Sequence, residues 1–268
     1  MFPFSDARPV TQRRSILLPL IAVLIAAIAA PAPVFGQGEP TQIVVRAVSH
    51  DAKLLQDPVG GAEIRITDAE TGAVLAEGRQ KGDSGSTAKI MREPRKRGVS
   101  IYDTEGAAHF DTTLTLDRPR RVQITARGPL DYPHAMQSAS VTTTLMPGRD
   151  VTGDGIVLPI HGFIVETLRP STAPAAGDTV EIRARIRMMC GCPTEPGGLW
   201  DSDEITIQAE ALGRDGSVIA EQPLTFTGTT SEFSGELSIP ADAATLRITA
   251  VDESGTNAGL QTTDLAAE

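Results

Sequence analysis

The chain has 268 residues and a formal net charge of −10 at pH 7, with 34 acidic and 24 basic side chains. A negatively charged surface repels nucleic acid and anionic lipid. We therefore do not expect nucleic acid as a partner, nor a membrane once an N-terminal signal has been removed. Aromatic residues make up 4% of the chain, so its cores must rest on Val, Ile, Leu and Ala.

The first 36 residues have the order of a secretory signal. A basic leader, an apolar run and a short stretch of small residues and prolines follow one another at residues 8–14, 16–30 and 31–36. The apolar run is shorter than the roughly 20 residues that span a bilayer. We therefore expect residues 1–36 to be a signal peptide helix, and the mature chain to be periplasmic or extracellular. An uncleaved membrane anchor is the alternative.

The mature chain shows the alternation of β-strands. Val180, Ile182, Ala184, Ile186 and Met188 alternate with charged residues, which places aliphatic side chains on one face and charges on the other. The same period of two recurs within residues 62–66, 122–126, 205–209 and 246–250, and turn residues separate these runs. Many short strands predict an all-β fold of two β-sandwich domains in tandem.

Composition predicts the domain boundaries. Residues 169–178 contain two prolines and almost no apolar bulk, as is typical of a linker. We therefore expect a first domain over residues 37–168, a linker over 169–178 and a second domain over 179–256. The polar residues 257–268 are expected to form a tail or an edge strand.

The first domain resembles transthyretin-like, carboxypeptidase-regulatory-like domains. The resemblance lies in the strand–turn–strand of residues 61–78 and the strand that starts at residues 106–110. It implies an exported seven-stranded sandwich, usually without catalysis of its own. A long insertion over residues 81–104 departs from that pattern.

The second domain resembles bacterial immunoglobulin-like repeats. The resemblance lies in residues 177–182, 233–242 and 250–259, which match an opening strand, a late strand with its turn, and a closing strand. It implies a fold and no particular activity.

Both cysteines of the chain lie in the segment Met188-Met189-Cys190-Gly191-Cys192, at the end of a predicted strand. Residues 189–204 form a longer loop here than the immunoglobulin-like resemblance implies, and they include Trp200, the single tryptophan. An oxidising compartment favours a Cys190–Cys192 disulfide, and Gly191 lets the backbone turn tightly enough to form it. In that case Trp200 would plug a small core.

Two other interpretations of this segment stay open. Met188, Met189, Cys190 and Cys192 offer four sulfur ligands of the kind that select Cu(I), and Trp200 is placed to cap a bound cation. The objection is that alternation points the two methionines to opposite faces. The remaining interpretation is thiol–disulfide exchange, although no helix is expected to lower a cysteine pKa.

Two further segments are candidates for binding. Asp150, Thr152 and Asp154 place oxygen atoms at alternate positions, as at the start of a calcium loop, although a glycine-rich turn gives the same pattern. Four basic residues between positions 92 and 97 predict either a solvated loop or a docking patch for an acidic partner or a second copy.

The sequence contains no nucleophile elbow, Walker loop or dinucleotide fingerprint. We therefore expect a non-catalytic binding or assembly protein of the bacterial periplasm or cell surface, with a protein or another envelope component as its partner. The alternatives are a periplasmic Cu(I)-binding protein, with copper as its cofactor, and a thiol–disulfide active protein.

Overall fold

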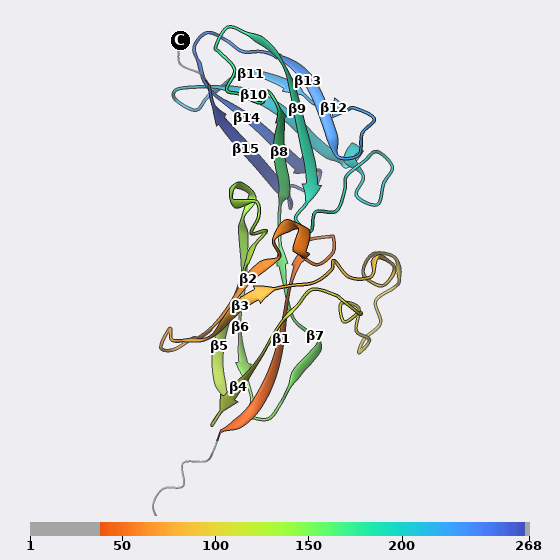
Figure 1. Cartoon of the computed structure of the whole chain (residues 1–268), viewed down its shortest axis with the longest axis vertical. Coiled ribbons are helices and arrows are strands. Elements are labelled where there is room, and N and C mark those ends of the chain that lie inside the picture. The colour runs from red at the N-terminus through yellow and green to blue at the C-terminus, as the bar shows by residue number, and fades with distance from the viewer. Residues whose placement is uncertain (1–37, 266–268) are drawn as a thin grey trace, which may run out of the picture. The chain divides into compact units, whose positions relative to one another are not determined.

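A computed structural model describes residues 38–265, and within that range the chain is an all-β protein of four sheets (Figure 1). The all-β class predicted from alternation is confirmed. The predicted signal helix lies outside the described residues. Within the described range, no helix has the length and apolar character needed to cross a membrane.

The first seven strands form one β-sandwich. They are β1 (Glu39–Ser49), β2 (Ala62–Asp68), β3 (Val74–Gln80), β4 (Phe110–Leu116), β5 (Arg120–Gly128), β6 (Gln137–Leu145) and β7 (Val151–Ile160). The orders are β4-β1-β7 in one sheet and β3-β2-β5-β6 in the other. The pairing of β1 with β7 is parallel, whereas the other pairings in these two sheets are antiparallel.

The last eight strands form a second β-sandwich. They are β8 (Phe163–Arg169), β9 (Thr179–Met188), β10 (Ile205–Gly213), β11 (Val218–Pro223), β12 (Thr225–Phe226), β13 (Glu232–Ser238), β14 (Ala243–Asp252) and β15 (Ala258–Asp264). The orders are β12-β13-β9-β8 and β11-β10-β14-β15. In chain order these are the A-B-E-D and C′-C-F-G sheets of an immunoglobulin-like sandwich.

Aliphatic side chains from both sheets fill each core, as the alternation requires. In the first sandwich Ile64 and Ile66 of β2 face residues of β1 such as Ile43, and all three are fully buried. In the second, Ile182 and Ile186 of β9 pack with Ile248 of β14. The strands predicted at residues 62–66, 122–126, 180–188, 205–209 and 246–250 are all present.

Four short helical turns complete the described chain: η1 (Asp57–Val59), η2 (Ala88–Arg92), η3 (Pro133–Ala135) and η4 (Ser202–Glu204). The turn η2 belongs to the 81–104 insertion between β3 and β4. Ile90 and Tyr102 of this insertion pack with Val48 and Leu54 in a third, smaller apolar cluster. The insertion therefore covers the outer side of β1.

Residues 169–178 are not a linker between the sandwiches. They connect β8 to β9, which are antiparallel neighbours in one sheet, and Gly177 and Asp178 are hydrogen-bonded to Ile239. The chain crosses to the second sandwich earlier, at His161 and Gly162. The low apolar content that predicted a linker is equally typical of a surface loop between strands. Within residues 257–268, predicted to form a tail or an edge strand, Ala258–Asp264 form the edge strand β15.

Candidate functional site

The loop between β9 and β10 contains a disulfide between Cys190 and Cys192, as one of the sequence interpretations predicted. The two α-carbons are 5.3 Å apart, and Gly191 between them has a φ of 79°, a conformation that glycine adopts without strain. The amide of Met188 donates to the carbonyl of Cys192 at 3.1 Å, which closes the turn. Cys190 is fully buried and Cys192 nearly so.

Polar contacts tie the next part of this loop to the second sandwich. The hydroxyl of Thr194 donates to the carbonyl of Ile186 at 2.7 Å, and the amide of Thr194 donates to the hydroxyl of Ser231 at 3.1 Å. The amide of Ser231 donates in return to the carbonyl of Thr194 at 2.9 Å. Thr194 and Ser231 are both buried, so this network fixes the loop against the end of β9.

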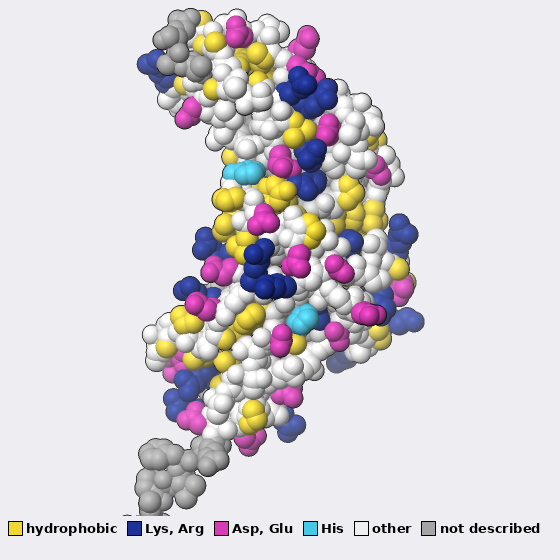
Figure 2. All heavy atoms as spheres, in the orientation of Figure 1, with side chains coloured by type: hydrophobic (Ala, Val, Ile, Leu, Met, Phe, Trp, Pro, Cys, Tyr) yellow, Lys and Arg dark blue, Asp and Glu magenta, His cyan; other side chains and the backbone are white. Residues whose placement is uncertain are grey.

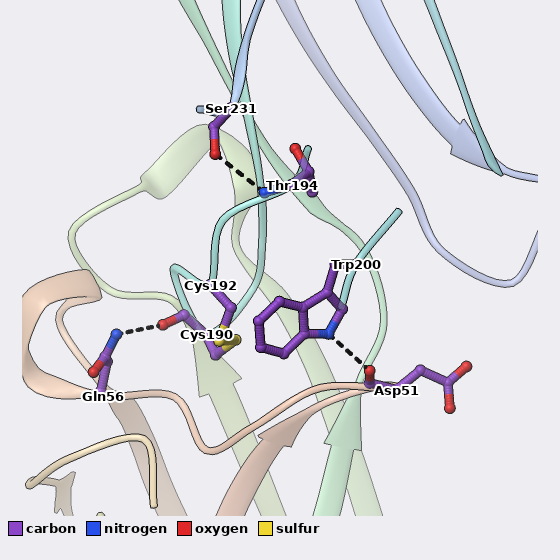
Figure 3. Close-up of a disulfide and its surroundings, with 7 residues drawn as sticks. All are labelled: Asp51, Gln56, Cys190, Cys192, Thr194, Trp200 and Ser231. Carbon is purple, nitrogen blue, oxygen red and sulfur yellow. Dashed lines mark hydrogen bonds between the residues drawn. A yellow bond between two sulfur atoms is a disulfide. The ribbon is translucent and has the colours of Figure 1, made fainter. Parts of the chain in front are cut away.

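Two hydrogen bonds tie the same loop to the first sandwich (Figure 3). The side chain of Gln56 donates to the carbonyl of Cys190 at 3.0 Å, and the indole nitrogen of Trp200 donates to the carbonyl of Asp51 at 3.1 Å. Figure 3 shows the six-membered ring of Trp200 beside the disulfide. The loop is thus held from both sandwiches, and the disulfide and Asp51 together orient the indole.

The four sulfur atoms predicted as copper ligands are divided between two cores. Met188, Cys190 and Cys192 belong to the core of the second sandwich, whereas Met189 is fully buried in the core of the first. The two methionines therefore lie in different cores, although β9 ends at Met188 and Met189 belongs to the turn that follows. The sulfur atoms of Cys190 and Cys192 are bonded to each other, so neither is present as a thiolate that could bind copper. Within residues 38–265, no three His, Cys, Asp or Glu side chains are grouped as metal ligands would be.

A half-buried ion pair lies next to the loop. Arg187 of β9 donates to Glu166 of β8 at 2.6 Å and to the hydroxyl of Tyr132 at 2.6 Å, and its guanidinium carbon lies 5.1 Å from the centre of the Tyr132 ring. Burial lowers the pKa of Arg187, but these two partners outweigh it and leave the pKa above its usual value. Because Tyr132 lies in the first sandwich, this group also joins the two sandwiches.

A pocket of about 170 Å³ opens beside Trp200. Its apolar lining comes from Phe163, Met188, Leu199, Trp200 and Ile205, and its polar lining from Asp51, Asp201, Glu204, Asp252 and Asn257. No Lys or Arg of residues 38–265 lines it. Figure 2 shows acidic and basic side chains interspersed over one face of the molecule.

Two of these carboxylates are built into turns. The carboxylate of Asp201 accepts from the amides of Gly197 and Asp203, and these hydrogen bonds hold its pKa below the usual value. The carboxylate of Asp252 accepts from the amides of Thr256 and Asn257. Burial raises the pKa of Asp252, but its hydrogen bonds outweigh that effect and lower it. Both groups are therefore charged at neutral pH.

The predicted calcium ligands are engaged by the backbone. Asp150 accepts from the amide of Gln42 at 2.8 Å. Asp154 accepts from the hydroxyl of Ser100 and from the amides of residues 101, 102 and 103 at the end of the insertion. Thr152 is exposed in the same bulged part of β7. Burial raises the pKa of Asp154, but the hydrogen bonds lower it overall, as expected of a carboxylate that anchors a loop.

Sequence reasoning missed Arg46, a residue that is 2% exposed overall. It donates to the carbonyls of Ala107 and Ala108 at 3.3 and 2.9 Å, and to Asp103 at 3.1 Å. The burial of Arg46 could have been predicted from the apolar residues on both sides of it within residues 43–48. Such a run indicates a strand covered on both faces, where a charged side chain needs buried partners.

No protein-family model and no curated protein matches this chain. The solved structures to which this chain is similar include two of titin domains. The crystal structure of the titin domains Z1Z2 in complex with telethonin is 14% identical over 87% of this chain and 89% of that one, with a TM-score of 0.24. A chimeric titin Z1Z2 functionalized with an exogenous KLER peptide from decorin is 13% identical over 87% of this chain and 98% of that one, with a TM-score of 0.24. Scores this low carry no argument, so the fold assignment rests on the strand order.

Proposed function

We propose that this chain is an exported, non-catalytic binding or assembly protein of the periplasm or cell surface, and that the loop of residues 189–204 is its binding region. The main observation in support is that contacts with both sandwiches and a disulfide hold this loop, and that an open pocket lies beside it. Binding surfaces are typically loops positioned by a rigid scaffold.

Export is supported by three features of the chain. The N-terminal segment has the basic, apolar and small-residue order of a secretory signal. The Cys190–Cys192 disulfide is of a kind that persists in oxidising compartments. The transthyretin-like resemblance of the first domain implies an exported sandwich of seven strands, and seven strands precede the crossing at residue 161. These features favour the periplasm or the cell surface.

We do not extend the proposal to copper binding or thiol exchange. Copper would require reduction of a buried disulfide and a new position for Met189, which is fully buried in the other core. Thiol exchange would require access to a sulfur atom, and both cysteines are buried. The contacts of the loop instead support a role in positioning Trp200 and its neighbours.

Photo-cross-linking in the cells that produce the protein tests the proposal. Leu199 in the pocket and Val218 on β11 are 42% and 43% exposed, so a photoreactive amino acid at either position reaches solvent equally well. We expect a discrete cross-linked adduct with another protein from position 199 and not from position 218. Equal products from both positions, or none from position 199, would contradict the proposal.

A further inference from the structure

The pocket beside Trp200 has two chemically distinct parts. Its apolar floor comes from Phe163, Met188 and Ile205 together with Leu199 and the indole of Trp200. Its carboxylates are Asp51, Asp201, Glu204 and Asp252. An apolar wall next to unpaired negative charge suits a ligand that has an aliphatic stem and a cationic end.

The size of the pocket limits the ligand. Sites for drug-sized molecules have volumes of roughly 300–1,000 Å³, whereas this pocket has about 170 Å³. It is therefore suited to one long side chain rather than to a drug-sized cofactor.

The carboxylates of the pocket have few cationic partners among the described residues. Among residues 38–265, none of the four carboxylates forms an ion pair with a lysine or arginine. Asp51 contacts His50 at 3.2 Å, and Asp201 and Asp252 accept hydrogen bonds from turn amides. The carboxylate of Glu204 has no side-chain hydrogen bond or ion pair in that part of the chain. It is the group most available to a cation from outside.

The indole of Trp200 adds selectivity within the class of cations. Its nitrogen is held by the carbonyl of Asp51, and its orientation is fixed from the side of the disulfide (Figure 3). A guanidinium group stacks on an aromatic face and pairs with carboxylates through its fork of N–H donors, which a lysine ammonium does less well. The geometry therefore favours arginine over lysine.

We propose that this pocket binds an arginine side chain of a partner polypeptide, with the stem on the apolar floor and the guanidinium among the carboxylates. This inference rests on the proposed binding function and names the chemistry of the partner. The disulfide loop acts as the frame that holds Trp200 and Glu204 in place.

Trp200 is the single tryptophan of the chain, so its fluorescence reports directly on the pocket. The probe is an acetylated and amidated tetra-arginine peptide, with tetra-lysine and tetra-glutamine peptides as comparisons. We expect saturable changes in emission with tetra-arginine, weaker binding of tetra-lysine, and no binding of tetra-glutamine. Binding should weaken as salt is added. Equal responses to tetra-arginine and tetra-glutamine would overturn the proposal.

A pair of variants separates pocket binding from general attraction to an acidic protein. Glu204→Gln removes the available carboxylate of the pocket, whereas Glu236→Gln removes an exposed carboxylate on β13 that does not line it. We expect Glu204→Gln to weaken tetra-arginine binding by about fivefold, in line with one solvent-accessible ion pair. Glu236→Gln should leave it unchanged. Equal losses in the two variants would overturn the pocket as the site.

The experiments distinguish a failure of the arginine pocket from a failure of the proposed binding function. A discrete cross-link from position 199 without peptide binding would overturn the arginine pocket and leave the binding function standing. Peptide binding without any cross-link from position 199 would contradict the proposed cellular function while supporting the chemistry of the pocket.

Discussion

Gly191 lies directly against Val59, so that a β-carbon on Gly191 would come within 2.6 Å of a methyl group of Val59. Because Gly191 also has a positive φ, two physical effects require glycine between the two cysteines. This contact brings the disulfide turn of the second sandwich onto η1 of the first. It is a contact between segments far apart in the sequence, and glycine is the residue that fits it best.

We expect Gly191→Ala to destabilise the protein more than a matched glycine substitution. Gly197, in the same loop, has a φ of 67°, and no atom of the described residues lies within 4 Å of its hypothetical β-carbon. Gly197→Ala should therefore cost about 1 kcal/mol from backbone strain alone. Gly191→Ala should cost a further ~1–3 kcal/mol from overpacking against Val59. Urea denaturation measures both.

A double-mutant cycle identifies the contact responsible. In a Val59→Ala background the space beside Gly191 is larger, so Gly191→Ala should cost less than it does in the wild-type chain. An unchanged cost would show that the backbone conformation, and not the contact between the sandwiches, determines the requirement for glycine.

Alternation predicted the sandwich strands because one face of each strand is buried and the other is exposed. The prediction was incomplete at β1, where Val44 and Arg46 on the outer face are also buried. Their burial depends on the 81–104 insertion, which folds back over the strand from a distance in the sequence. Alternation reports the local environment of a strand, and it does not identify a distant segment that covers it.

The disulfide was predicted from the cysteine spacing, but its place in the molecule was not. Gln56, Val59 and Asp51 contact the disulfide loop from about 130 to 150 positions away in the chain. These three residues have no distinctive sequence pattern. The boundary error at residues 169–178 has a similar cause, since composition indicates a surface loop without indicating which elements it connects.

Removal of the disulfide should affect the pocket more than the global stability. The ring closed by Cys190 and Cys192 is very small, so the chain-entropy model gives a contribution of about 1–2 kcal/mol. In the variant Cys190→Ala/Cys192→Ala we expect a comparably small loss on urea denaturation. We also expect a red shift in the emission of Trp200, because the indole loses its contact with the disulfide. Unchanged emission would contradict the role of the disulfide in orienting the indole.

The Glu166–Arg187 pair should contribute measurably to stability. Its side chains are 22% and 19% exposed, and the guanidinium also bonds to Tyr132. We expect Glu166→Gln to cost about 1–3 kcal/mol, because it weakens a charge-assisted hydrogen bond in a half-buried site. Glu181, whose pair with Arg183 on the same strand is more exposed, provides the control. Glu181→Gln should change the unfolding free energy by less than about 0.5 kcal/mol, and equal costs would contradict the prediction.

Asp68 should make stability depend on pH in the acidic range. Hydrogen bonds from Arg120 and from the amides of Thr71 and Glu70 hold the pKa of Asp68 well below its usual value. Because the folded state binds this proton less readily than the unfolded state, the stabilising effect is full above the unfolded pKa, near 4. It is lost as the pH falls toward the folded value.

Urea denaturation at several pH values between 7 and 2.5 checks this dependence. Asp68→Asn removes the titrating group, so the variant should be less stable than the wild type at pH 7, and the difference should shrink toward acidic pH. A difference that stays constant across this range would show that the carboxylate acts through its shape rather than through its charge.

Asp154 should hold the insertion in place rather than bind calcium. Its carboxylate accepts hydrogen bonds from Ser100 and from the amides of residues 101–103, so Asp154→Ala leaves these donors without their acceptor. We expect amide hydrogen exchange in residues 100–103 to accelerate by at least about tenfold, which corresponds to ~1.4 kcal/mol of lost local stability. Asp150→Ala, which removes an acceptor for Gln42, should leave exchange in residues 100–103 unchanged. If calcium slows exchange there in the wild type, and both variants abolish that effect, the carboxylates bind the ion and the anchoring role is wrong.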